Sequence, residues 1–193
     1  MDNEIIIATI GIAGTLGGTV LGWFLNNLSQ KGKVSIFIKE WEDKLQYNKA
    51  GVMTASHSFE ETEYYGYKVS LDLYNSSRDT KIMRNIQIEF ADKKKQLLVN
   101  VPKDDSTRRS DGHMAFCDDA SVINVPAKTV LNVNFHGCVW RTKKSAHDDL
   151  AFLQRTDRVI LKYTNEKNKE KKLIFKKEIY KDYFTNHEIK DDE

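Results

Sequence analysis

The sequence predicts a mainly β protein, in which a single N-terminal transmembrane helix precedes an antiparallel β-sandwich with one short helix. Two observations predict it. An uncharged run of twenty-one residues extends from Ile5 to Leu25. Most of the chain after this run alternates apolar and polar residues with a period of two, as strands with one buried face do. The predicted parts are an anchor over 1–30, a sandwich over 31–183 and a frayed acidic tail over 184–193.

The apolar run is long enough to cross a bilayer as a helix. Twenty-one residues at a rise of 1.5 Å extend about 30 Å, the thickness of the hydrocarbon core. Trp23 fits the aromatic belt at the lipid–water interface, and Lys31 and Lys33 follow the run. Because basic residues mark the cytoplasmic side, we expect a single-pass protein of the cell membrane whose domain lies in the cytoplasm. A cleaved signal peptide is disfavoured, since the N-terminus is acidic and no small-residue cleavage site follows.

Glycines line one face of the predicted span. Gly14, Gly18 and Gly22 recur every four residues, which places them on the same side of a helix. A face without Cβ atoms lets a second helix approach closely in lipid. The pattern predicts self-association or contact with another membrane protein, and the alternative is that glycine is simply frequent in membrane spans.

The remaining chain predicts a sandwich because short alternating runs are separated by turn signals. Turns are expected at Asn75–Asp79, Asp92–Lys95 and Asn165–Glu170. The alternating runs fall at 34–38, 65–73, 86–90, 97–101, 131–135, 159–163 and 173–175. In general plan the strand order resembles immunoglobulin-like or fibronectin-like sandwiches, although the tryptophan and cysteine spacing of true immunoglobulin domains is absent.

Three further local features are predicted. Ser145 is expected to cap a short helix in which Leu150 and Leu153 face the core. Gly137 interrupts an alternating run and is interpreted as a β-bulge. The least regular stretches, 41–62 and 102–120, are expected to be long loops.

Four side chains are the candidates for metal or catalytic chemistry: His113, Cys117, His136 and Cys138. The four residues form two pairs in the sequence, His113 with Cys117 and His136 with Cys138. The second pair would share one face of a strand, but neither pair has the spacing of a structural zinc site. A catalytic cysteine would need a histidine base, and His113 is the only local candidate for Cys117. We therefore expect no metal, no cofactor and no enzymatic activity. Whether the two cysteines pair is left open, with separate reduced thiols favoured.

Charge gives little indication of a ligand. The 30 basic and 28 acidic residues are interspersed, so nucleic acid is not an expected partner. Clustered lysines in the turns are explained by solubility and the protection of sheet edges. The alternative for these lysines is attraction to anionic lipid near the anchor.

These observations together predict a non-enzymatic, membrane-anchored binding or assembly module on the cytoplasmic face. Its partners would be the bilayer, through the helix, and a second copy or another membrane protein, through the glycine face. The Lys-, Asn- and Ile-rich composition is typical of AT-rich bacterial genomes, so an accessory factor of a phage or plasmid is one interpretation. The alternatives are an extracytoplasmic anchored binding domain and an enzyme or metal site built from Cys and His.

Overall fold

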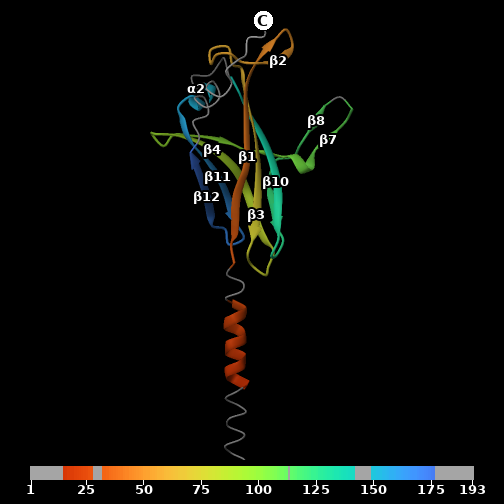
Figure 1. Ribbon diagram of the computed structural model, residues 1–193, viewed down its shortest axis with the longest axis vertical. Helices are drawn as coiled ribbons and strands as arrows, with labels where there is room; N and C mark the ends of the chain where they lie inside the picture. Colours follow the sequence, from red (N-terminus) through yellow and green to blue (C-terminus); the bar gives the residue numbers. More distant parts are fainter. Residues whose placement is uncertain (1–14, 28–31, 113, 142–148, 177–193) are drawn as a thin grey trace, which may run out of the picture.

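The computed structural model describes residues 15–27, 32–112, 114–141 and 149–176. They form an N-terminal helix over 15–27 and, after it, two antiparallel sheets with a short helix and a projecting two-stranded arm (Figure 1). The expected antiparallel sandwich with one short helix is confirmed.

No helix in the described part of the chain is both long enough and apolar enough to cross a membrane. Residues 1–14 and 28–31 of the predicted anchor and its flanks, Gly14 and Lys31 among them, lie outside the described residues. The predicted acidic tail also lies outside them.

The first sheet has the strand order β2-β1-β3-β10-β6. Its strands are β1 (Val34–Lys49), β2 (Val52–Ala55), β3 (Tyr64–Asn75), β10 (Val130–Trp140) and β6 (Lys103–Asp104). Alternation in β3 works as predicted, since every second side chain from Tyr65 to Leu73 is buried. This sheet supplies one face of the core.

The prediction of a long loop over 41–62 is wrong for most of its length. Strand β1 continues to Lys49 and pairs with β3 up to the partners Gln46 and Tyr64, and β2 then pairs back with the end of β1. The physical reason is an irregularity in register between Ile38 and Glu40. Such a bulge shifts the inward positions by one residue, so a strict period of two is lost although the strand continues.

The second sheet has the order β12-β11-β4-β5, and a further strand, β9, also pairs with β4. Its strands are β4 (Lys81–Asp92), β5 (Leu97–Asn100), β9 (Val122–Val125), β11 (Thr156–Asn165) and β12 (Glu170–Lys176). The turns predicted at Asp92–Lys95 and Asn165–Glu170 join β4 to β5 and β11 to β12. Lys95 and Asn168 adopt positive φ there, as tight turns often require.

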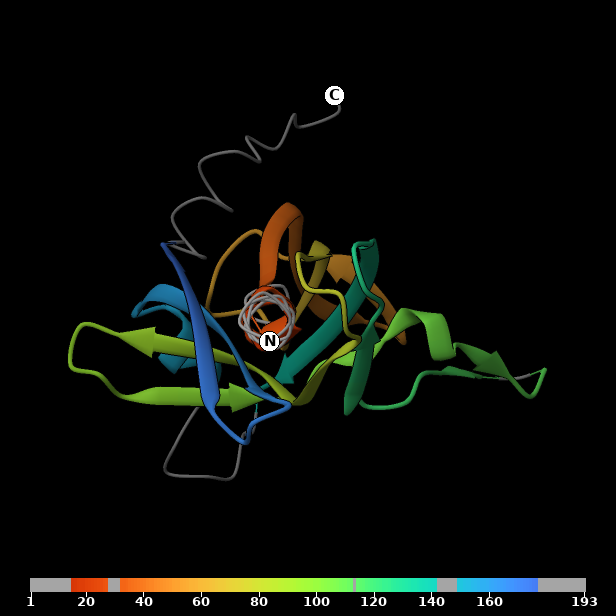
Figure 2. The ribbon, with the colours of Figure 1, turned by 90° about the horizontal axis from the view of Figure 1, so that it is seen from below.

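The stretch 102–120 is not a plain loop either. Besides β6 it contains a 3-10 turn, η1 (Asp105–Thr107), and two short strands, β7 (Arg109–Ser110) and β8 (Ala115–Phe116), which pair with each other. Figures 1 and 2 show this β7–β8 arm extending beyond the two sheets. Strands of two residues are too short to show alternation, so the sequence could not reveal them.

The predicted short helix is α2 (Asp149–Leu153), and Leu150 and Leu153 are fully buried on its inner side, as expected. The proposed cap, Ser145, lies outside the described residues.

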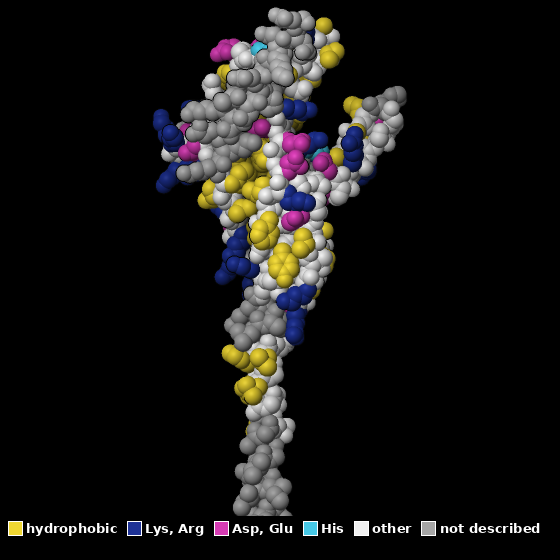
Figure 3. Space-filling view, viewed as in Figure 1, with side chains coloured by type: hydrophobic (Ala, Val, Ile, Leu, Met, Phe, Trp, Pro, Cys, Tyr) yellow, Lys and Arg dark blue, Asp and Glu magenta, His cyan; other side chains and the backbone are white. Residues whose placement is uncertain are grey.

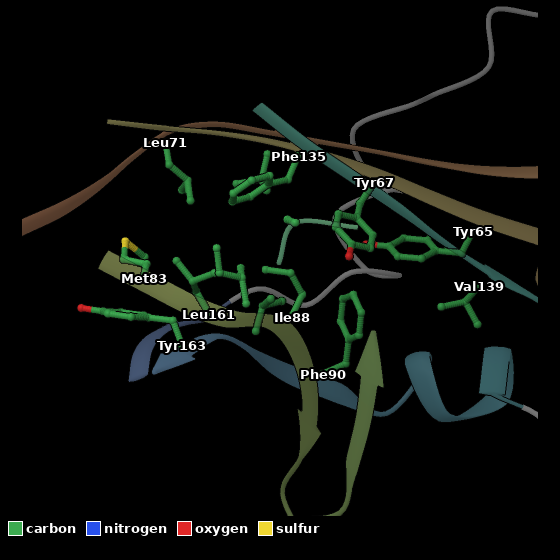
Figure 4. Close-up of a cluster of buried hydrophobic side chains, with 14 of the residues drawn as sticks. Tyr65, Tyr67, Leu71, Met83, Ile88, Phe90, Phe135, Val139, Leu161 and Tyr163 are labelled. Carbon is green, nitrogen blue, oxygen red and sulfur yellow. The ribbon is translucent and has the colours of Figure 1, made fainter. Parts of the chain in front are cut away.

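An aromatic cluster fills the core between the sheets. Figure 4 shows Tyr65 and Tyr67 of β3 pointing toward Phe90 of β4. Their rings meet the Phe90 ring edge to face, with centroids 6.0 and 5.7 Å away. Trp41 of β1 stacks on Tyr67 at 5.1 Å. Large rings bury much apolar area, so this cluster contributes strongly to holding the two sheets together.

Gly137 does not form the predicted bulge. The pairing of β10 with β3 runs through it without a shift in register. A Cβ at this position would instead overlap the Tyr67 hydroxyl and Oδ1 of Asn100. Glycine is therefore explained by the close approach of two side chains to the backbone.

Candidate functional site

The structure brings together only two of the four predicted metal or catalytic residues among those it describes. Cys117 follows β8, while His136 and Cys138 lie on the same outward face of β10. His113 lies outside the described residues. Both cysteines are free thiols, so they are not joined by a disulfide. Cys117 and His136 come together at the base of the β7–β8 arm, whereas Cys138 is exposed and is not part of that group.

A third residue, Asp105, completes this group. One ligand atom each from Asp105, Cys117 and His136 lies within 4.8 Å of the others. Nδ1 of His136 also forms a hydrogen bond with the Asp105 carboxylate. All three residues are partly buried, and the side chains of Asp105 and His136 are each 37% exposed. The group, which we name the arm-base cluster, is thus accessible to a small ligand.

Asp105 reaches His136 because of the short strand before it. In β6, Lys103 pairs with His136 and Asp104 with Phe135. The turn η1 begins at the next residue, and the Asp104 carboxylate accepts a hydrogen bond of 2.9 Å from the Ser106 N–H. This capping arrangement turns the chain at the point where Asp105 lies beside His136.

Cys117 is brought to the cluster by the returning chain. The Asp104 N–H donates to the Asp118 carbonyl at 2.9 Å, and the Ala120 N–H donates to the Pro102 carbonyl at 2.8 Å. These two hydrogen bonds join the outgoing and the returning chain at the base of the arm. Cys117 therefore lies opposite Asp105 even though twelve positions separate them in the sequence.

Thr107 joins the two sides of the arm base. Its hydroxyl donates to the Asp104 carbonyl at 2.7 Å and accepts from the Asp118 N–H at 2.8 Å. Asp104 precedes Asp105, and Asp118 follows Cys117. The hydroxyl thus fixes the spacing of the backbone that carries two members of the cluster.

Ion pairs surround the cluster. Lys103 Nζ lies 2.7 Å from the Asp119 carboxylate, and Arg109 contacts the Asp118 carboxylate. The hydrogen bond that the Lys103 ammonium donates to the Asp119 carboxylate raises the pKa of Lys103 above its ordinary value. Lys103 and Arg109 are thus paired with Asp119 and Asp118, and the Asp105 carboxylate contacts His136 instead.

The chemistry of the cluster is that of soft and intermediate donors. A thiol, an imidazole and a carboxylate are the ligand types that zinc takes in proteins. The donor types of the cluster therefore fit the coordination of a metal ion.

Sequence reasoning did not identify Asp105. It is one of two adjacent acids, and nothing in their spacing distinguishes it from Asp104. Its role depends on a strand of only two residues and on a contact with His136, 31 positions further along the chain.

The described members of the predicted anchor, Gly18, Gly22 and Trp23, lie on the N-terminal helix, and Lys33 lies at the start of the sandwich. A Cβ at Gly18 or Gly22 would meet nothing within 4 Å. Trp23 is 66% exposed. Lys33 precedes β1, and its N–H donates to the Ser76 hydroxyl at 3.0 Å.

Comparisons with known proteins bear on the sandwich. A family model described as the YopI Ig-like domain matches residues 32–176. No curated protein matches the chain. An uncharacterised β-sandwich protein from Clostridium difficile 630 is 17% identical, with 76% of this chain and 89% of that one covered and a TM-score of 0.33. YcdA of Bacillus subtilis, a proposed lipoprotein, is 14% identical with a TM-score of 0.39. That match covers 77% of this chain and 39% of YcdA.

Proposed function

The chain belongs to the YopI Ig-like domain family through residues 32–176, and from that premise we propose that it is a non-enzymatic binding module held at the cell membrane by its N-terminal helix. An Ig-like fold hosts many unrelated roles, so the family alone does not assign this one. Support for the proposal comes from the helix and from the end of the sandwich that the helix joins.

The observation that carries the proposal is an apolar helix whose side chains are all exposed. Every side chain over 15–27 is exposed, and the large apolar ones are 51–66% exposed: Leu16, Val20, Leu21, Trp23, Phe24 and Leu25. An uncharged helix that exposes so many large apolar side chains needs an apolar environment, either a protein interior or lipid. The uncharged sequence extends back to Ile5, which favours lipid.

Polar side chains within the helix agree with this environment. The Thr19 hydroxyl donates to the Thr15 carbonyl at 2.7 Å, one turn earlier. In hydrocarbon a hydroxyl has no water to bond, so an internal partner removes most of the cost of burying it.

The end of the sandwich next to the helix is rich in basic side chains. Lys33 and Ser76 exchange backbone and side-chain hydrogen bonds of 3.0 and 3.1 Å, which fixes the start of β1 against the loop between β3 and β4. Figure 3 shows Lys and Arg side chains at this end. Exposed basic residues in its loops are Lys33, Arg78, Lys128, Lys167 and Lys169. Near anionic lipid each such charge contributes about 1 kcal/mol of attraction.

Two further elements of the proposal concern orientation and partners. The lysines that follow the span favour a domain in the cytoplasm. Gly18 and Gly22 leave open space on the helix, and a second helix can pack closely against such a face. The proposed partners are therefore the bilayer and either a second copy or another membrane protein.

Fractionation of cells that express the full chain tests the anchor. We expect the protein to stay in the membrane pellet after an alkaline wash, which removes peripheral proteins. Leu21→Lys places a charge in the span and should release a large fraction. Val130→Lys, an equally exposed apolar position on the sandwich, is the matched control and should stay in the pellet. Complete release of the unmodified chain by the wash would overturn the proposal.

Reporter fusions at the C-terminus test orientation. A fluorescent protein that matures only in the cytoplasm should be bright, and an alkaline phosphatase that folds only outside should be inactive. The reverse pair of results would assign the domain to the outer face, which is the extracytoplasmic alternative.

A further inference from the structure

We propose that Asp105, Cys117 and His136 bind a divalent transition metal ion of the zinc class at the base of the β7–β8 arm. This site is separate from the helix and from the basic end of the sandwich, so it does not depend on the anchor. Three kinds of observation carry it: the spacing of the donor atoms, their chemistry and the rigidity of the backbone that holds them.

The donor atoms are already close to the spacing that a bound ion requires. Zinc bonds of about 2.0–2.3 Å to N, O and S in a tetrahedron place the ligand atoms roughly 3.3–3.8 Å apart. In the cluster the three atoms lie within 4.8 Å of one another, so small side-chain rotations suffice. His136 and Asp105 already share a hydrogen bond, and the ion would replace its proton.

The donor set selects the class of metal. Thiolate and imidazole ligands favour zinc and its neighbours, whereas Mg²⁺ and Ca²⁺ require oxygen ligands. Three protein ligands leave one tetrahedral position for water or for a donor from a bound partner. The site is also partly exposed, so this fourth position is accessible.

Hydrogen bonds and strand pairing hold the backbone around the site. The two hydrogen bonds that close the arm, Asp104 to Asp118 and Ala120 to Pro102, fix the two chain segments next to Asp105 and Cys117. His136 lies in the middle of β10, which pairs with β3 along its length. An ion would therefore link the arm to the first sheet, and its binding would stabilise the arm in the position that the structure shows.

Titration of the full chain, reduced and in detergent, with Co²⁺ tests the proposal. Cobalt in a site with a thiolate gives a charge-transfer absorption band that a site of oxygen ligands alone does not give. We expect this band to saturate at one equivalent and to disappear when Zn²⁺ is added. Cys117→Ser should abolish it, and His136→Gln and Asp105→Asn should weaken binding at least tenfold.

Cys138→Ser is the matched control, because Cys138 lies on the same face of β10 but is not part of the arm-base cluster. It should leave the band and the stoichiometry unchanged. Circular dichroism of each variant without metal checks that the fold is intact. If Cys117→Ser does not fold, the unmodified chain gives an independent measurement. One equivalent of Zn²⁺ should protect Cys117 from alkylation by iodoacetamide, and mass spectrometry measures the extent of alkylation.

Three results would overturn the proposal. The first is the absence of a saturable band in the unmodified chain. The second is a band that persists in Cys117→Ser or is lost in Cys138→Ser. The third is alkylation of Cys117 at the same rate with and without Zn²⁺, which would indicate a free thiol whose contact with Asp105 and His136 is only structural.

Discussion

The hydroxyl of Tyr67 donates a hydrogen bond of 2.6 Å to Oδ1 of Asn100 and thereby joins the two sheets. Tyr67 lies in β3 of the first sheet, and Asn100 ends β5 of the second. Nδ2 of Asn100 also donates to the Cys138 carbonyl at 3.1 Å. Burial raises the pKa of Tyr67, so the hydroxyl remains protonated and able to donate. The two side chains meet over Gly137, whose missing Cβ leaves the space they occupy.

Gly137→Ala is expected to destabilise the fold by about 1–3 kcal/mol, because its methyl group overlaps the Tyr67 hydroxyl and Asn100. Urea unfolding measures this cost. In a double-mutant cycle, Tyr67→Phe removes the hydroxyl and should make Gly137→Ala less costly than in the unmodified chain. A Gly137→Ala variant as stable as the unmodified chain would contradict the assignment of Gly137 to close approach.

Asn75→Asp is expected to cost about 2–4 kcal/mol. Asn75 is fully buried, and its Nδ2 donates to the carbonyls of Asp79 and Val125 at 2.8 and 2.9 Å. In the aspartate variant a carboxylate oxygen replaces the donating Nδ2. This buried oxygen faces the two carbonyl oxygens and, when the carboxyl is ionised, has no proton to donate to them. Asn134→Asp, on the exposed face of β10, is the control and should change stability by less than 0.5 kcal/mol. Equal unfolding midpoints for the two variants would be the contrary result.

Thr107→Val is expected to loosen the base of the arm while preserving the shape of the side chain. The variant loses the hydroxyl that bonds both the Asp104 carbonyl and the Asp118 N–H. Hydrogen exchange at the Asp118 amide should become faster, and the Co²⁺ affinity of the arm-base cluster should fall. Thr129→Val is the control, since its hydroxyl donates within its own loop, to the Ala127 carbonyl. Unchanged exchange at Asp118 would show that Thr107 does not position the cluster.

Acid should destabilise the sandwich partly through Glu170. Hydrogen bonds from Lys162 and then Lys172 lower the pKa of this carboxyl below its ordinary value of 4.5. A carboxyl with a lowered folded pKa stabilises the fold above its unfolded pKa, and this contribution is lost as the pH falls through the folded pKa. Urea unfolding between about pH 3 and pH 7 should therefore show a weaker acid dependence in Glu170→Gln. Glu42→Gln, exposed on β1, should follow the unmodified chain, and identical curves for all three would refute the prediction.

Gly18→Leu is expected to reduce association of the helix with itself. In the helix a Cβ at Gly18 meets no atom within 4 Å, so the larger side chain is tolerated by the monomer and obstructs only a second helix. Cross-linking in membranes should show several-fold less dimer than the unmodified chain does. Leu16→Ile preserves volume at an exposed position and serves as the control. An undiminished dimer would assign the contact to another surface or partner.

Much of the sandwich could be predicted from alternation because burial on one face acts on every second residue of a strand. Val69, Leu71 and Leu73 show this pattern and are buried as expected. The pattern failed where the backbone departs from it. The irregularity after Ile38 shifted the inward positions of β1, and the two-residue strands β7 and β8 are too short to carry any period.

For the candidate site, too, the sequence predicted some features and only the tertiary structure showed the others. The sequence alone determined the residue types and their pattern: an uncharged apolar run, a set of thiols and imidazoles that included Cys117 and His136, and the alternation that predicts a sandwich. Only the tertiary structure decided that Asp105, and not Cys138, lies with Cys117 and His136. The physical reason is that local pattern reports which face of a strand a residue occupies. Proximity across 31 positions is set instead by the pairing of β6 with β10 and the closure of the arm.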